Sequence, residues 1–245
     1  MAQVFLEQES INANRKKQKL FLSLFLFFSC ISIFLYFATR NLLDWNNPSD
    51  RKLVGLFFAL AGIMLFCVLF GLLVTMRPAK NGNNLILPFA ENSKEAIAEV
   101  INREVAEGKT QFESFINYNT VKKYGDRVLL LPSYLLLIGE MGQITAIPRG
   151  KIYWICAQVG YKGGPFYVRL LIFTEQKIFD FDGNDIEHTK EIANGLYQYI
   201  PNAFHEYDPQ ELSYLLEKLY QENRAGFLAF YEEEKRKKNT ETSIS

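Results

Sequence analysis

The chain has 245 residues, and its 27 Lys and Arg balance 27 Asp and Glu, so the formal net charge is zero. Residues 77–245 carry 20 Lys and Arg against 23 Asp and Glu, a net of −3, which argues against a nucleic-acid binder because such proteins carry a basic excess. The three cysteines, Cys30, Cys67 and Cys156, have no paired spacing, so neither a disulfide framework nor a zinc site is indicated.

Two long apolar runs, residues 20–39 and 53–76, contain no charged side chain. At 20 and 24 residues, each passes the threshold of roughly 18–20 apolar residues for a membrane-spanning helix. A signal peptide is the alternative for the first run. Its apolar region is usually ~7–15 residues long and ends in a small-residue cleavage pattern, which this run lacks. The sequence therefore predicts a retained transmembrane hairpin.

The charges that flank the two runs predict their orientation. Four cations, from Arg15 to Lys19, precede the first run, and Arg77 and Lys80 follow the second, whereas the loop 40–52 carries three. Cations concentrate on the cytoplasmic side of a membrane. We therefore expect a multi-pass protein of the cell membrane with both termini in the cytoplasm.

The chain divides into seven predicted segments. They are a cytoplasmic N-terminal segment (1–19), two spans (20–39 and 53–76) around a short external loop (40–52), a linker (77–92), a cytosolic domain (93–237) and a disordered polar tail (238–245).

Small residues form a stripe on the second run. Gly55, Ala59 and Gly62 fall at i, i+4 and i+7, on one face of a helix, and close helix approach in lipid uses such stripes. The stripe either packs against the first span of the same chain or meets a helix of a second copy or of another membrane protein.

Four helices are predicted in the cytosolic domain. Ser93 caps a helix over 94–107, whose apolar stripe includes Ile97 and Ile101 and whose other face is charged. Asn184 and Glu187 resemble a capping box for a helix over 185–199. Two more helices are predicted over 209–223 and 224–237.

Between these helices the sequence is typical of strands. Short runs rich in Val, Ile, Leu, Phe and Tyr, bounded by turn residues, cover 127–131, 134–138, 143–147, 152–159, 166–173 and 177–181. The connections are too short for parallel crossovers, so the strands predict an antiparallel meander. Residues 112–121 are ambiguous and fit an additional edge strand.

Cations and aromatic side chains gather at two places in the strand region, which makes Arg149, Lys151, Tyr161 and Lys162 candidate interaction residues. If 152–159 and 166–173 form a hairpin, residues 161–164 lie at its tip, where they can touch lipid headgroups or a peptide. The alternative is a core Trp154 with solvated cations around it.

No motif indicates catalysis, a cofactor or a metal. The acidic segment 180–185 departs from the calcium-loop pattern, because its glycine is fourth where the EF-hand glycine is sixth. His188 and His205 have no Cys partner, and no P-loop, GxGxxG or Ser-His-Asp signature is present. We expect a non-enzyme, and an enzyme without a recognised motif is the alternative.

The strand pattern resembles bacterial membrane-anchored proteins with a pleckstrin-homology-like (PH-like) domain. The resemblance rests on RVLLLPSYLLLI at 127–138, a glycine turn, AIP at 146–148 and KIYWI at 151–155. It covers about residues 125–201 and implies a seven-stranded α+β domain, a sheet or barrel followed by a helix, behind two N-terminal spans. Only six strands are clear here, and the turn Pro132-Ser133 brings no basic set that would bind a phosphoinositide, so lipid recognition is not carried over.

The expected function is that of an interaction or scaffold module. The predicted partners are the lipid bilayer and a membrane or cytosolic protein, and a homodimer is an alternative. A regulatory subunit that docks in a larger membrane complex through its second span is the alternative function.

Overall fold

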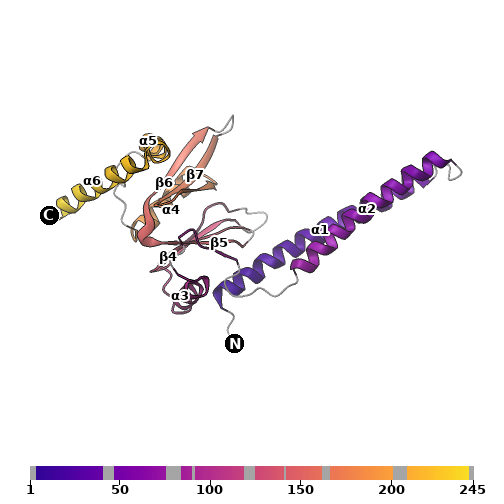
Figure 1. Ribbon diagram of the computed structural model, residues 1–245, viewed down its shortest axis with the longest axis horizontal. Coiled ribbons are helices and arrows are strands. Elements are labelled where there is room, and N and C mark those ends of the chain that lie inside the picture. Colours follow the sequence, from indigo (N-terminus) through magenta and orange to yellow (C-terminus); the bar gives the residue numbers. More distant parts are fainter. Residues whose placement is uncertain are drawn as a thin grey trace. The chain divides into compact units, whose positions relative to one another are not determined.

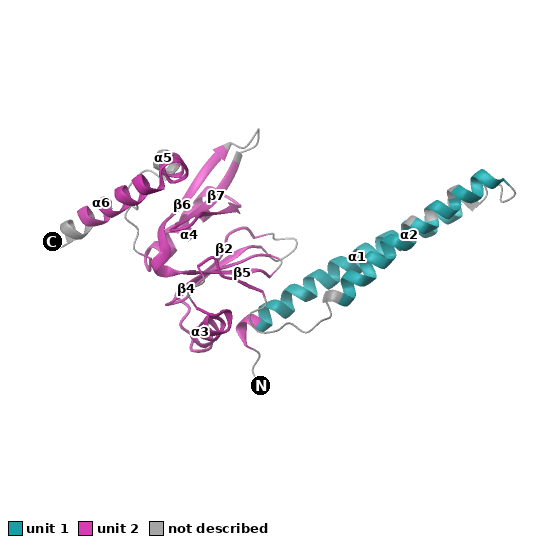
Figure 2. Cartoon of the chain, viewed as in Figure 1, with its two compact units in different colours: residues 1, 7–80 teal, residues 2–6, 81–245 magenta. Residues whose placement is uncertain are grey.

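The computed structural model describes residues 4–40, 47–75, 84–89, 92–118, 125–140, 142–161, 166–200 and 209–242. Figure 2 shows two compact units, one of residues 1 and 7–80 and one of residues 2–6 and 81–245. The first is helical, and the second combines two sheets with helices, so the predicted α+β class is confirmed.

The first unit consists of two long helices, α1 (Phe5–Arg40) and α2 (Pro48–Thr75) (Figure 1). Both are long and apolar enough to cross a membrane. Helix α1 begins well before the apolar run, because residues 5–19 contain no glycine or proline to interrupt it. Asn47 caps α2: its side-chain oxygen accepts from Ser49 N at 3.1 Å, and Pro48 takes the first helical position.

The two helices contact each other through aromatic side chains. The rings of Tyr36 and Phe58 lie 6.3 Å apart. Gly71 sits against Phe21, where a Cβ would lie 2.6 Å from the ring. Ser32 donates to Phe28 O at 2.8 Å, which satisfies its hydroxyl within an apolar helix.

The first sheet of the second unit has five strands in the order β1-β5-β4-β3-β2. Their bounds are β1 (Leu85–Ile86), β2 (Phe112–Phe115), β3 (Arg127–Leu130), β4 (Tyr134–Ile138) and β5 (Ile144–Pro148). Strands β2 to β5 form an antiparallel meander, so the ambiguous segment 112–121 does supply a strand. The short β1 pairs parallel to β5, which makes the sheet mixed and was not predicted.

The second sheet is antiparallel, in the order β6-β7-β8. Its strands are β6 (Ile152–Tyr161), β7 (Phe166–Thr174) and β8 (Ile178–Gly183), and a short 3-10 turn, η1 (Arg149–Lys151), connects it to β5. The single predicted meander is thus two sheets. The register of β6 shifts between Ile152 and Trp154, and this bulge sends Tyr153 and Trp154 toward the same apolar cluster.

Helix α3 (Lys94–Ala106) matches its prediction. Ser93 Oγ accepts from Ala96 N at 3.2 Å, and the chain leaves the helix through Gly108, whose φ is 68°.

The C-terminal helices are α4 (Ile186–Tyr197), α5 (Pro209–Glu222) and α6 (Arg224–Thr242). The cap of α4 is Asp185, which accepts from His188 N at 2.8 Å, and not Asn184, whose amide donates to Tyr118 O instead. Helix α6 runs to Thr242, into the segment predicted as a disordered tail.

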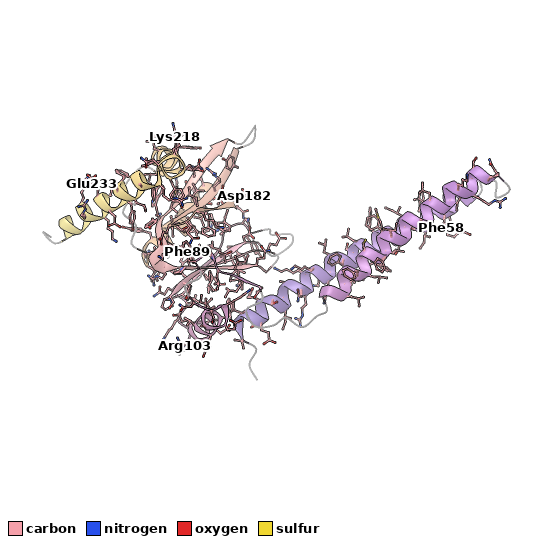
Figure 3. The ribbon with its side chains drawn as sticks, viewed as in Figure 1. Phe58, Phe89, Arg103, Asp182, Lys218 and Glu233 are labelled. Atoms are coloured by element: carbon pink, nitrogen blue, oxygen red, sulfur yellow. The ribbon has the colours of Figure 1, made fainter. Side chains whose placement is uncertain are left out.

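Three apolar clusters order the second unit into layers. The inner cluster lies between the two sheets and under α4, with Phe89 in it (Figure 3). A second covers the outer face of the first sheet with α3 and Leu6. The third covers the outer face of the second sheet with α5 and α6. The strands are therefore apolar on both faces, as is usual for sheets buried on both sides.

Candidate interaction surfaces

Arg149, one of the predicted interaction residues, is bonded within the unit. Its guanidinium donates to Gln111 Oε1 at 2.9 Å, to Pro132 O at 3.2 Å and to Tyr199 O. It thus joins η1 to the β3–β4 turn and to the segment after α4, where a cation is favourable because helix carbonyls point there. This geometry gives Arg149 a structural role.

Of the other three predicted interaction residues, only Lys151 has a described side chain. Its ammonium lies 2.6 Å from Glu175 Oε2, in a pair exposed to solvent. The backbone of Tyr161 pairs with Phe166 at the end of the β6–β7 hairpin. The side chain of Tyr161 and the whole of Lys162 lie outside the described residues.

The small-residue stripe faces away from α1. A Cβ added at Gly55 or at Gly62 would meet nothing within 4 Å, and Ala59 is exposed. The described contacts between the two helices instead use Gly71 and the aromatic side chains. The stripe is therefore not the contact surface between α1 and α2.

Three hydrogen bonds join the end of β2 to the β8–α4 junction. Asn117 Nδ2 donates to Asp182 O at 3.0 Å and Asn184 Nδ2 to Tyr118 O at 3.1 Å. His188 Nε2 lies 2.7 Å from Phe115 O, so this nitrogen carries the proton. The bonds hold two sheet edges together and give His188 a structural partner.

The acidic segment that superficially resembles a calcium loop is used in the fold. Asp180 pairs with Arg169, Asp182 accepts through its backbone oxygen, and Asp185 caps α4. Across the described residues, no three His, Cys, Asp or Glu side chains gather in a way that could hold a metal ion.

The outer face of the second sheet carries a dense aromatic cluster. Trp154 and Phe173 of the sheet have ring centroids 5.1 Å apart. Phe227 of α6 stacks on Phe173 at 5.7 Å, and Tyr220 of α5 meets the Phe173 ring edge-on at 5.9 Å. Tyr220 also donates to Thr174 O at 2.9 Å. Helices α5 and α6 therefore attach to this face mainly through aromatic rings.

A polar network borders the aromatic cluster. Arg169 of β7 donates to Asp180 at 2.9 Å, to Glu217 of α5 at 2.9 Å and to Gln158 of β6. Its side chain is 11% exposed, and its Nε is a buried donor without a partner. Burial lowers the pKa of Arg169, but the hydrogen bond and charge of Asp180 and the charge of Glu217 raise it above the usual value.

Sequence reasoning missed this network. Gln158 and Arg169 interrupt apolar strand runs, and a polar residue in such a run is the signal that a buried partner exists. Glu217 lies far along the chain and carries no local mark that pairs it with Arg169.

Burial under α5 and α6 raises the pKa of several acidic side chains. Desolvation is the main cause that raises the pKa of Tyr153, Tyr220 and Tyr231. Burial likewise raises the pKa of the Cys156 thiol far above its usual value. A thiol held neutral in this way is a poor nucleophile.

No family model, curated protein or solved structure matches this chain.

Proposed function

We propose that this chain is an integral membrane protein whose second unit is a PH-like domain that acts as a protein-interaction or scaffold module. The observation that carries the proposal is the order of elements. Two helices that can cross a membrane come first, and the meanders β2–β5 and β6–β8 followed by α4 come after them.

Strand β2 supports the PH-like assignment. The resemblance implies seven strands and a following helix, and β2 adds a seventh antiparallel strand to the six that the sequence makes clear. The two-residue parallel strand β1 is an addition to these seven. With β2 included, the first hairpin of the meander is β2–β3, and the Pro132-Ser133 turn belongs to the next one. The loop 119–124 of that first hairpin lies outside the described residues.

The surfaces that the helices leave uncovered support the proposed interaction role. Helix α3 covers the outer face of the first sheet, and α5 and α6 cover that of the second. While these helices stay in place, a partner meets this module at its hairpins and edges. The β6–β7 hairpin pairs out to Tyr161 and Phe166, and the cation and aromatic side chains of its tip suit a protein surface.

A photo-crosslinking amino acid at Tyr161 tests this role in the full chain in its native membrane. We expect a discrete crosslinked protein that is lost when Lys162→Glu is added. The matched control places the same probe at Gln176, in the exposed turn at the opposite end of the sheet. Equal crosslinking at the two positions, or none at Tyr161, would refute the role of the hairpin tip.

A regulatory subunit or homodimer that docks through α2 is the second candidate function. The outward orientation of Gly55, Ala59 and Gly62 favours it, because this stripe is free to meet another helix. Gly55→Leu and Gly62→Leu should abolish co-purification or reduce the oligomer size, whereas Met64→Leu, at an exposed position of α2, should not. An unchanged assembly in both glycine variants would rule this function out.

A further inference from the structure

Helices α5 and α6 form what we call the C-terminal arm, which covers the outer face of the second sheet. Figure 1 shows it beside β6 and β7, on the side away from β4 and β5. Its contact side buries Leu216, Tyr220, Phe227 and Tyr231. Lys218 and Glu233 lie on its exposed side (Figure 3).

The two sheets with the inner cluster between them form what we call the sandwich, and its core is complete without the arm. The inner cluster draws its members from both sheets, from α4 and from Phe89, and none of them from α5 or α6. The cluster beneath the arm shares no residue with it, because the second sheet separates the two. A layer whose contacts form a cluster separate from the inner core can open as a cooperative unit of its own while the rest stays folded.

We infer that the C-terminal arm is a detachable cover, which opens while the sandwich stays folded and which conceals a protein-docking face on the second sheet. This inference does not depend on the hairpin-tip role proposed above. The face combines Tyr153, Trp154 and Phe173 with Arg169, and aromatic residues and arginine dominate binding energy at protein interfaces.

The electrostatic cost of this opening is limited. Removing one member of a buried ion pair is costly when the other is left as an uncompensated charge. Arg169 keeps Asp180 and Gln158, both on the sheet, when the arm leaves, and Glu217 passes into water. The face therefore stays organised in the open state, with its guanidinium already positioned.

The partner that fits this face is an amphipathic helix with a carboxylate beside apolar and aromatic side chains. Helix α5 offers that pattern with Leu216, Glu217 and Tyr220. Glu217 Oε2 bonds only one guanidinium nitrogen, and Arg169 Nε has no partner. A carboxylate placed bidentately would make a second bond to the guanidinium, one that Glu217 does not make, so such a helix can displace the arm.

Cys156 lies beneath the arm and reports its opening. In the full chain with Cys30→Ser and Cys67→Ser, Cys156 is the remaining thiol of three, and it is 3% exposed. We expect the free energy of the opening that exposes Cys156 to a maleimide to be smaller than that of the opening that exposes the β4 amides of Leu135 to Leu137 to exchange.

Glu217→Gln should speed labelling of Cys156 roughly 10- to 100-fold, the range for loss of one charge-assisted hydrogen bond. It should leave the exchange of the β4 amides unchanged. Glu191→Gln, an exposed carboxylate on α4, is the matched control and should have no effect.

A synthetic peptide of residues 209–242, added to the Glu217→Gln chain, then tests the docking face. It should slow Cys156 labelling, and the same peptide with Glu217→Gln should slow it less. If the free energies of opening from Cys156 labelling and from β4 amide exchange are equal in every variant, the inference is overturned, because the arm would then be an integral part of the sandwich. Faster labelling without protection by the peptide would overturn the docking face.

Discussion

Two arginine side chains determine how several elements of the second unit fit together. Arg149 joins three separate segments, and Arg169 joins two strands to α5. The sequence marks Arg149 as a cation among aromatic residues, a pattern equally typical of a binding surface. Only the fold brings Gln111, Pro132 and Tyr199 to it, so the sequence could not distinguish a structural arginine from a binding one.

Replacing Arg149 distinguishes a structural role of this arginine from a binding role. Arg149→Lys should lower the free energy of unfolding of the second unit by about 1.5–3 kcal/mol, because one ammonium cannot reach all three acceptors. Urea unfolding of the full chain in detergent micelles, followed by circular dichroism, measures the change. Lys151→Met, which breaks the solvent-accessible pair with Glu175, should change stability by less than about 1 kcal/mol. Equal effects of the two substitutions would contradict the structural role of Arg149.

Gly125 precedes β3 at a point of very close backbone approach. A Cβ there would lie 1.5 Å from Asn117 O, and Asn117 is itself bonded to Asp126 and Asp182. Gly125→Ala should therefore destabilise the unit by about 1–3 kcal/mol or more. Gly150→Ala meets nothing within 4 Å and should stay within about 0.5 kcal/mol of the parent. The same unfolding experiment compares them, and a neutral Gly125→Ala would contradict the close approach.

Apolar runs were sufficient to locate most strands and helices, but not to divide them between two sheets. Val128 and Leu130 face the inner cluster, whereas Leu129 and Leu131 face α3, so the run has no alternation that reveals its faces. Strand β1 is two residues long and exists through its pairing with β5, which leaves no local signal.

Two neighbouring residues are each suitable as the N-cap of α4. Asn184 and Asp185 are both good cap residues, and the hydrogen bond from Asn184 to Tyr118 O leaves the cap to Asp185. Likewise, α1 extends through a polar segment that no apolar run marks, because nothing in residues 5–19 ends a helix.

The attachment of the C-terminal arm should weaken in alkaline solution. The folded-state pKa values of Tyr153, Tyr220 and Tyr231 are raised above the ordinary value of about 10. Their contribution to stability is therefore fully present below about pH 10 and is lost as pH rises through the raised values. Trp154, left as the remaining Trp of two by Trp45→Phe, should report the loss of the arm by its fluorescence.

Tyr231→Phe provides the control for this alkaline transition. It removes one of the three ionisable phenols and keeps the ring contact with Tyr153, whose centroid lies 4.9 Å away. The transition should become less steep and shift to higher pH. A transition that is unchanged by Tyr231→Phe, or fluorescence that stays constant until well above pH 10, would contradict the role of these phenols.

At the scale of the whole molecule, we propose a membrane hairpin followed by an α+β interaction module. Length and hydropathy were sufficient to predict two helices that can cross a membrane, because the bilayer sets the length of a crossing helix. The predicted orientation rests on flanking cations. The proposed partner cannot be identified from the sequence, because binding surfaces are set by side chains that the fold brings together.

Cysteine accessibility in intact cells tests the proposed hairpin and its orientation most directly. The variants Asn47→Cys, between the two spans, and Ser245→Cys, at the end of the chain, are each made in a background with Cys30, Cys67 and Cys156 replaced by serine. Both proteins should stay in the membrane pellet after alkaline carbonate washing. A membrane-impermeant maleimide should label the Asn47→Cys variant in intact cells and the Ser245→Cys variant only after lysis. Release of the protein by carbonate, or labelling of the Ser245→Cys variant in intact cells, would contradict a hairpin that holds this module on the cytoplasmic side.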